Sequence, residues 1–137
     1  MIYMLDTDTC SYIMRQRSSS VLENLQDRAN KGFILCISVI TYQELRFGAE
    51  RVGSAKYHAR IDQVCKRLDY VADWTRECAD RFAITQSLLM KNGTPIGFAD
   101  AMIASHAQQI EAILVSNNQK HFSQVEGLRL ENWFTEQ

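Results

Sequence analysis

Acidic residues recur along this chain in places where they could act together on a phosphate. Asp6 and Asp8 directly follow the first short apolar run, Glu44 lies in a later helical pattern, and Asp100 lies near the start of another. Carboxylates that are brought together repel one another unless a cation lies between them. Oxygen ligands without His or Cys suit Mg²⁺ or Mn²⁺ and not zinc. Because a carboxylate-bound Mg²⁺ can align a water with phosphorus and stabilise a charged transition state, this acid set predicts metal-dependent hydrolysis at a phosphate.

The pattern of apolar residues predicts the elements that must position these acids. Short apolar runs indicate strands at residues 2–5, 33–38 and 112–116, with weaker strands at 70–72 and 128–130. A helix starts at residue 41, and further helical patterns occupy about 18–29, 56–68, 75–90 and 100–109. Strands that alternate with helices predict an α/β fold, here a three-layer α/β/α sandwich with a mostly parallel sheet of four to five strands.

A parallel sheet would bring the candidate residues to one place. In an open sheet of this kind, ligands bind beyond the carboxyl ends of the strands. Asp6 and Asp8 follow the first strand, while Ser116 ends the fourth and Asn118 lies two residues beyond it. Separate segments therefore deliver carboxylate, hydroxyl and amide oxygens to one edge. The functional hypothesis rests on this joint placement and not on any single residue.

Structural explanations exist for the acids of the first two segments. Asp6 and Asp8 are suited to cap a helix that begins near Thr9. Thr41 and Glu44 have the spacing of a capping box, in which Glu44 would only accept a hydrogen bond from a backbone N–H. In these alternatives the carboxylates stabilise helix ends and have no catalytic role.

Similar explanations apply to the later residues. Asp100 suits the first turn of a helix, where a negative charge is favourable, and Asn118 suits the end of a strand. The three histidines, His58, His106 and His121, are interpreted as surface or packing residues.

The composition is that of an ordinary globular domain. The 137 residues are 46% hydrophobic and 23% charged, which fits one domain over residues 1–137. The net charge of −1 shows no overall basic signature for nucleic acid, but carboxylates of a metal site mask basic residues in this sum. The four cysteines are expected to be reduced, small apolar residues. With no basic start typical of a signal peptide and no apolar run near the roughly 20 residues of a membrane span, we expect a cytoplasmic protein.

Four ordered motifs make the sequence similar to the PIN domain and, within it, to the VapC toxins. They are Met4-Leu-Asp-Thr-Asp8, Ile37-Ser-Val-Ile-Thr-Tyr-Gln-Glu44-Leu, Gly93-Thr-Pro-Ile-Gly-Phe-Ala-Asp100 and Val115-Ser-Asn-Asn118. The resemblance covers nearly the whole chain. It implies a PIN-like sandwich in which Asp6, Glu44 and Asp100 are the acidic metal-site residues and Ser116 is a small hydroxyl residue near them.

The resemblance also implies an activity and partners. It indicates the toxin of a bacterial type II toxin–antitoxin system, an endoribonuclease that uses Mg²⁺, with Mn²⁺ as a substitute. The expected substrate is tRNA, with the anticodon region of initiator tRNA as one candidate, so that translation is inhibited. Such toxins form homodimers and are silenced by a cognate VapB-type antitoxin in a larger hetero-oligomer. An inhibitor is expected to present an Arg to Asp6 or Asp100 and apolar side chains to the surface around Tyr42, Leu45 and Phe47.

Two positions depart from the family pattern. Position 8 is commonly Asn in this family and here is Asp8, which adds negative charge at the mouth of the site. The fourth site position is Asp in many PIN domains and here is Asn118, which leaves open whether one or two metal ions bind.

Three alternative functions are weighed against this one. Asp6-Thr-Asp8-Thr9 fits the nucleophile motif of a haloacid-dehalogenase-type phosphatase, in which Asp6 would attack phosphorus, but no aspartate follows Ser116. A phospho-accepting receiver domain needs an acid at the end of a central strand, where Ser38 stands instead. A PIN-fold protein that binds RNA without cutting it would not need the complete acid set.

Overall fold

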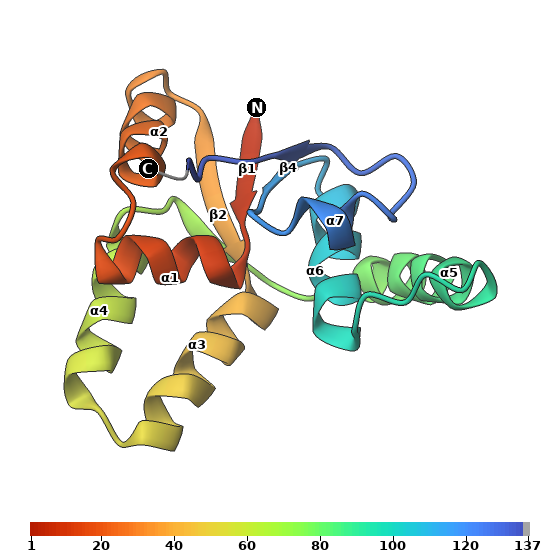
Figure 1. Cartoon of the computed structure of the whole chain (residues 1–137), viewed down its shortest axis with the longest axis horizontal. Coiled ribbons are helices and arrows are strands. Elements are labelled where there is room, and N and C mark those ends of the chain that lie inside the picture. The colour runs from red at the N-terminus through yellow and green to blue at the C-terminus, as the bar shows by residue number, and fades with distance from the viewer. Residues whose placement is uncertain (136–137) are drawn as a thin grey trace.

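The computed structural model describes residues 1–135 and confirms an α/β fold built on one parallel sheet (Figure 1). Its strands are β1 (Ile2–Leu5), β2 (Ile34–Ser38), β3 (Tyr70–Ala72), β4 (Ile113–Val115) and β5 (Leu130–Glu131). Neighbouring strands are parallel throughout, in the order β3-β2-β1-β4-β5. All carboxyl ends therefore point to the same edge of the sheet, where ligands bind in folds of this kind.

The helices follow the predicted segments, with two additions. They are α1 (Thr7–Arg15), α2 (Ser19–Asn30), α3 (Val39–Val52), α4 (Ala55–Lys66), α5 (Arg76–Lys91), α6 (Phe98–Gln109) and α7 (Gln119–Phe122). The sequence pattern predicts no helix at α7, which is a single turn, and α1 is predicted only as an alternative explanation of Asp6 and Asp8. The opening of α1 is polar, and its buried apolar residues, Cys10, Ile13 and Met14, come later.

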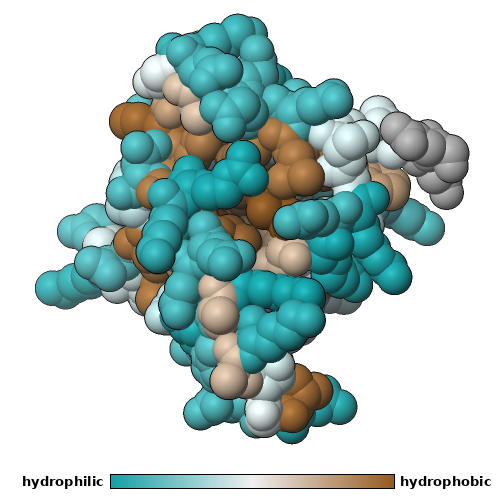
Figure 2. Space-filling model, turned by 90° about the vertical axis from the view of Figure 1, so that its left-hand side faces the viewer, coloured by the Kyte–Doolittle hydropathy of each residue, from teal (hydrophilic) through white to brown (hydrophobic). Residues whose placement is uncertain are grey.

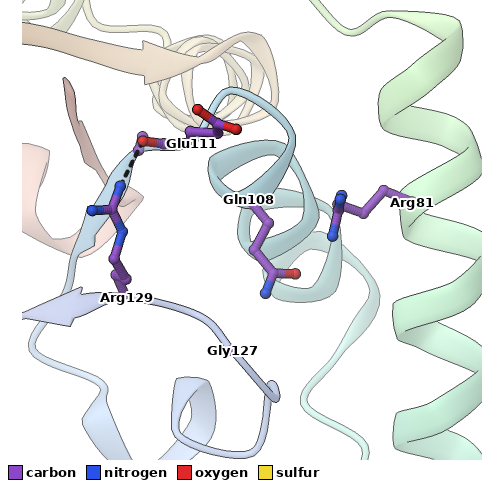
Figure 3. A pocket seen from close by; sticks show the side chains of 6 residues that line it. Arg81, Gln108, Glu111, Gly127 and Arg129 are labelled. Atoms are coloured by element: carbon purple, nitrogen blue, oxygen red, sulfur yellow. Dashed lines mark hydrogen bonds between the residues drawn. The ribbon is translucent and has the colours of Figure 1, made fainter. Parts of the chain in front are cut away.

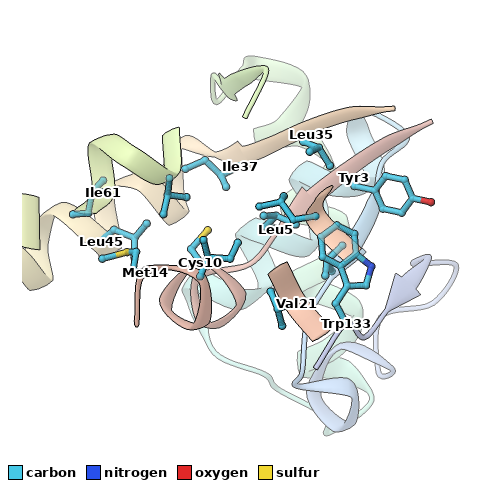
Figure 4. Close-up of a cluster of buried hydrophobic side chains, with 14 of the residues drawn as sticks. Tyr3, Leu5, Cys10, Met14, Val21, Leu35, Ile37, Leu45, Ile61 and Trp133 are labelled. Atoms are coloured by element: carbon cyan, nitrogen blue, oxygen red, sulfur yellow. The ribbon is translucent and has the colours of Figure 1, made fainter. Parts of the chain in front are cut away.

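Side chains along each strand alternate between two hydrophobic cores. In β1, Tyr3 and Leu5 join a core with α1, α2 and α4 (Figure 4), whereas Met4 joins a second core with α5 and α6. In β2, Ile37 lies in the first core and Cys36 in the second. Burial of one such side chain contributes about 1.5–3 kcal/mol. The sheet is therefore buried on both faces, which confirms the three-layer α/β/α arrangement.

Two helical pairs extend beyond the sheet on different sides (Figure 1). The first is α3 with α4, and the second is α5 packed on α6. Gly53 ends α3 with a φ of 65°, a left-handed conformation that favours glycine and lets the chain turn back into α4. The pairs lie on either side of the carboxyl ends of the strands, so α3 and α6 both approach that edge.

The cysteines are free thiols, as expected. Cys10, Cys36 and Cys78 are buried, and Cys65 is half-buried. Among the helices of residues 1–135, none has the length and apolar character that a membrane crossing requires.

Candidate active site

Asp6 lies at the end of β1 and is buried. Its side chain is 4% exposed, and its Oδ1 accepts a hydrogen bond from the Thr9 backbone N–H at 2.9 Å, which caps α1. Burial raises the pKa of Asp6 to about 6, although hydrogen bonds from Ser116 and Thr9 act in the opposite direction. The capping function considered for Asp6 is therefore real, and the same carboxylate also lies beside Ser116 at the end of β4.

Ser116 and Asn118 form the neighbouring wall of the site. Ser116 directly follows β4 and is fully buried, and its Oγ accepts a hydrogen bond from the Asn118 N–H at 2.9 Å. The backbone N–H of Asp6 donates to the Val115 carbonyl at 3.0 Å, which ties the ends of β1 and β4 together. These contacts hold the Ser116 hydroxyl next to the Asp6 carboxylate.

Asp100 reaches the same region from the first turn of α6. Burial raises the pKa of its carboxyl, and His121 lowers it. His121 Nδ1 lies 3.5 Å from Asp100 Oδ2 and 3.0 Å from Asn118 Nδ2. The charge of the exposed Asp8 raises the pKa of both Asp6 and Asp100. Asp8 is therefore close enough to repel both carboxylates, and His121 Nδ1 can either accept from the Asn118 amide or, when protonated, pair with Asp100.

Glu44 enters the site from α3 and is held by Thr7. The Thr7 hydroxyl donates to Glu44 Oε1 at 2.6 Å, and Thr7 itself directly follows Asp6. The capping-box explanation for Glu44 is wrong, because α3 begins one turn earlier with Ser38 as its N-cap. The Glu44 carboxylate thus contacts another segment of the chain and does not close the end of its own helix.

The structure places the predicted site residues at one edge of the sheet. Their side chains do not converge on a single point. Within residues 1–135, no three His, Cys, Asp or Glu side chains converge closely enough to hold a metal ion. Sequence reasoning missed the contacts of Thr7 and His121. The signals for them were the position of Thr7 between two acids and the one-turn spacing from Asn118 to His121.

The residues present fit a hard divalent cation. Within the described chain, neither Asp6 nor Asp100 forms an ion pair with Lys or Arg, and the only ion-pair partner recorded for Asp100 is His121. Burying carboxylates without a cationic partner is unfavourable, as the raised pKa of each indicates. The donors at the edge are mainly carboxylate, hydroxyl and amide oxygens, the ligands that Mg²⁺ and Mn²⁺ prefer.

Two grooves elsewhere on the molecule lack this combination of groups. One lies at the amino end of β4 and is lined by Arg81, Gln108, Glu111, Ala112, Gly127 and Arg129 (Figure 3). The other lies between α1, α2 and α4, on the side shown in Figure 2, where hydrophobic surface is framed by hydrophilic side chains. Neither groove contains a candidate site residue, so the edge described above remains the candidate active site.

Comparison with known proteins shows the family of this fold. The PIN-domain family model matches residues 3–128. The chain is 35% identical over 132 residues to the tRNA(fMet)-specific endonuclease VapC of Shigella flexneri, covering 96% of this chain and 97% of that protein. It is 37% identical, with the same coverage, to Ribonuclease VapC2 of Haemophilus influenzae. This chain belongs to the PIN-domain family of VapC ribonucleases.

Solved structures show the same PIN fold. This PIN domain is similar to a chain in the crystal structure of VapBC2 from Rickettsia felis bound to a promoter DNA fragment. The TM-score is 0.89 at 34% identity, covering 97% of this chain and 99% of that chain. DNA-bound VapBC from Salmonella typhimurium has a TM-score of 0.85 at 30% identity, with coverage of 97% and 98%. Membership of this ribonuclease family excludes the phosphatase and receiver hypotheses.

Proposed function

We propose that this VapC ribonuclease is a metal-dependent endoribonuclease toxin that uses Mg²⁺, with Mn²⁺ as a substitute, and cleaves tRNA. The observation that carries the proposal is the placement of Asp6, Asp8 and Asp100 at the same carboxyl edge of the sheet, where Asp8 raises the pKa of both others and none has a Lys or Arg partner in the described chain. A negatively charged RNA cannot approach such an edge unless a cation offsets the negative charge of the carboxylates. When bound, a divalent cation supplies that charge and stabilises the transition state at phosphorus.

The chain's own residues take distinct roles in this proposal. Asp6 would hold the cation from the end of β1 and Asp100 from the first turn of α6, and Glu44 would complete the acid set from α3. Ser116 orients the Asp6 carboxylate through its buried hydroxyl. Asp8, which is exposed, and Asn118 lie at the mouth of the site, where they would meet the incoming RNA or an outer ligand.

The tRNA substrate is proposed from the relatives. The proteins of Shigella flexneri and Salmonella typhimurium, 35% and 32% identical to this chain, are both named tRNA(fMet)-specific endonucleases. The direct test is to incubate the purified protein with total bacterial RNA and Mg²⁺ and to sequence the new ends. Ends concentrated in one or a few tRNAs would support the proposal, and the anticodon region of initiator tRNA is the first place to look. New ends spread over all RNAs would contradict tRNA specificity.

Replacing Glu44 with Gln is expected to lower kcat at least about a hundredfold, because a neutral amide no longer contributes charge to the metal site. Gln keeps an oxygen for the Thr7 hydroxyl, so the melting temperature is expected to stay close to that of the parent. Cleavage rates and thermal melts of the two proteins measure both effects. Glu50→Gln, at an exposed position of the same helix, is the matched control. Parental cleavage by Glu44→Gln would leave this residue with a structural role only.

A VapB-like antitoxin is proposed as the partner that silences the site. A groove of about 580 Å³ between α3 and α4 is lined by Val39, Tyr42, Arg46, Asp62, Cys65, Lys66 and Val71. Phe47, on α3 but outside the lining of this groove, is a separate apolar group that is 66% exposed, whereas Leu45 is buried in the core and is not available. The expectation that a partner covers Leu45 is therefore wrong. Apolar side chains of the antitoxin would fill the groove, and an Arg would reach Asp6 or Asp100.

Expression of this chain alone is expected to arrest bacterial growth, since cleavage of an essential tRNA stops translation. Asp6→Asn should relieve the arrest, and so should co-expression of the antitoxin encoded beside it. Growth curves with matched protein levels, together with co-purification of the complex, measure both effects. Replacing the antitoxin's Arg with Ala should weaken the complex. Normal growth with abundant folded parent protein would refute the toxin proposal even if the protein cleaves RNA in vitro.

We also propose a cytoplasmic homodimer that joins the antitoxin in a larger hetero-oligomer. Ile84 and Leu88 are exposed one turn apart on α5, and Phe98 is exposed at the start of α6 against Phe82. A second copy would remove these apolar groups from water. Free cysteines and an RNA substrate are both in keeping with the cytoplasm.

A further inference from the structure

A buried hydrogen bond joins the start of α3 to the last turn of α6. Ser38 ends β2, and its Oγ accepts a hydrogen bond from the Ile40 backbone N–H at 3.0 Å, which caps α3. The same Oγ lies 2.7 Å from Nδ1 of His106, a residue 68 positions away in the chain. Both side chains are 0% exposed. The contact therefore connects two helices that belong to distant parts of the sequence, inside the core.

The imidazole of His106 is a poor choice for this core on grounds of stability alone. Its ring packs beside Trp74 of the second core, and its Nε2 has no well-formed hydrogen bond within the described residues, although the Asp73 backbone lies close to the ring. A buried polar group without a partner costs about 1–3 kcal/mol, which an apolar side chain would avoid. Burial lowers the pKa of His106 more than the nearby Asp73 raises it, which favours a neutral ring whose Nδ1 can accept from the Ser38 hydroxyl. Trp74 packs edge-on against the ring at 5.5 Å and 86°, which keeps its orientation.

The bond lies at the same distance along the chain from two of the site acids. Glu44 follows Ser38 by six residues, and Asp100 precedes His106 by six residues. At 1.5 Å per residue, each acid is about 9 Å along its helix from the bond. The chain runs away from the bond in α3 and toward it in α6, and the two helices contact each other. A shift of either helix relative to the other would therefore change the separation of Glu44 and Asp100.

We propose that the hydrogen bond between Ser38 and His106 is a positioning contact. It fixes the position of Glu44 relative to Asp100 as RNA cleavage requires. His106 touches neither the RNA nor the metal ligands in this account, and it acts through the placement of α3. The inference rests on the proposed function for its catalytic consequence. Its structural consequence, the fixed start of α3, can be measured without any activity.

Two substitutions of His106 separate positioning from packing. His106→Leu fills the core but removes the bond, so kcat is expected to fall about tenfold while KM stays within about twofold. His106→Asn leaves more empty space but keeps a hydrogen-bonding group near the position of Nδ1, so it should melt earlier than the parent and yet recover most of kcat. Ser105→Ala is the matched control, because it removes a neighbouring buried hydroxyl whose one hydrogen bond within residues 1–135 goes to the Ala101 carbonyl of its own helix at 2.7 Å.

Combination with Glu44→Gln tests whether His106 acts through that acid. In the Glu44→Gln background, His106→Leu is expected to cause no further loss of kcat, although its effect on the melting temperature should persist. Losses that multiply in the double variant would overturn the positioning proposal, and so would parental kcat in His106→Leu.

Amide hydrogen exchange provides the readout that does not depend on activity. His106→Leu should speed exchange in the first two turns of α3, while Ser105→Ala should not. If the parent cleaves no RNA with Mg²⁺ present, the proposed function fails, and exchange alone then decides the structural half of the inference. Unchanged exchange at the start of α3 in His106→Leu would overturn that half.

Discussion

Replacing Asp6 with Asn is expected to lower the rate of RNA cleavage at least about a hundredfold, equivalent to about 2.7 kcal/mol of transition-state stabilisation. The change removes one negative charge from the centre of the acid set, where a cation would bind. Asn retains a side-chain oxygen for the Thr9 N–H, so the cap of α1 survives. Asp100→Asn is expected to have an effect of the same order.

Melting without divalent cations separates loss of chemistry from loss of folding. A carboxylate that is 4% exposed and lacks a Lys or Arg partner in the described chain is costly to bury, and a neutral amide is less so. Asp6→Asn should therefore melt at the same temperature as the parent or higher, while being inactive. The matched control is Asp80→Asn, at an exposed position on α5, which should change neither quantity. Parental cleavage rates in Asp6→Asn would remove this residue from the site.

Removing divalent cations is expected to abolish cleavage, and adding Mg²⁺ or Mn²⁺ should restore it. Without a cation, the carboxylates at the sheet edge repel the phosphates of the RNA and one another. The first measurement is cleavage by protein dialysed against EDTA, followed by titration with each metal. Full activity after thorough stripping would refute the metal-dependent mechanism.

The melting temperature gives a second measurement, of metal binding to the folded protein. A cation that binds the folded state and not the unfolded state raises the melting temperature as its concentration increases. The parent is therefore expected to be stabilised by Mg²⁺ and Mn²⁺, and Asp6→Asn much less so. Equal stabilisation of the two proteins would indicate that the metal binds somewhere other than this edge.

The positions of the strands and of the acids could be predicted from the sequence because both depend on local patterns. Short apolar runs end at Asp6, Ser38 and Ser116, and helices separate them. A sheet whose strands are all parallel places every strand end on one edge, so the order of residues along the chain is sufficient to group them. The predicted strand at 70–72 was confirmed as β3, whereas the fifth strand lies at Leu130–Glu131, shifted towards the C-terminus from the predicted 128–130.

The roles of individual acids could not be separated in the same way. The spacing from Thr41 to Glu44 satisfies a capping box equally well, and only the observed start of α3 at Ser38 excludes it. Asp6 is both a helix cap and a buried site residue, a combination that no local pattern distinguishes from a cap alone.

The sequence by itself determined the fold class and the edge at which the acids gather, since periodicity, strand ends and helix starts are encoded within a few neighbouring residues. Only the tertiary structure decided which side chains touch. Thr7 holds Glu44 across 37 positions, and Ser38 meets His106 across 68. Such contacts depend on how helices pack on the two faces of the sheet, and the free energy that fixes that packing comes from many buried side chains together and not from any one local motif.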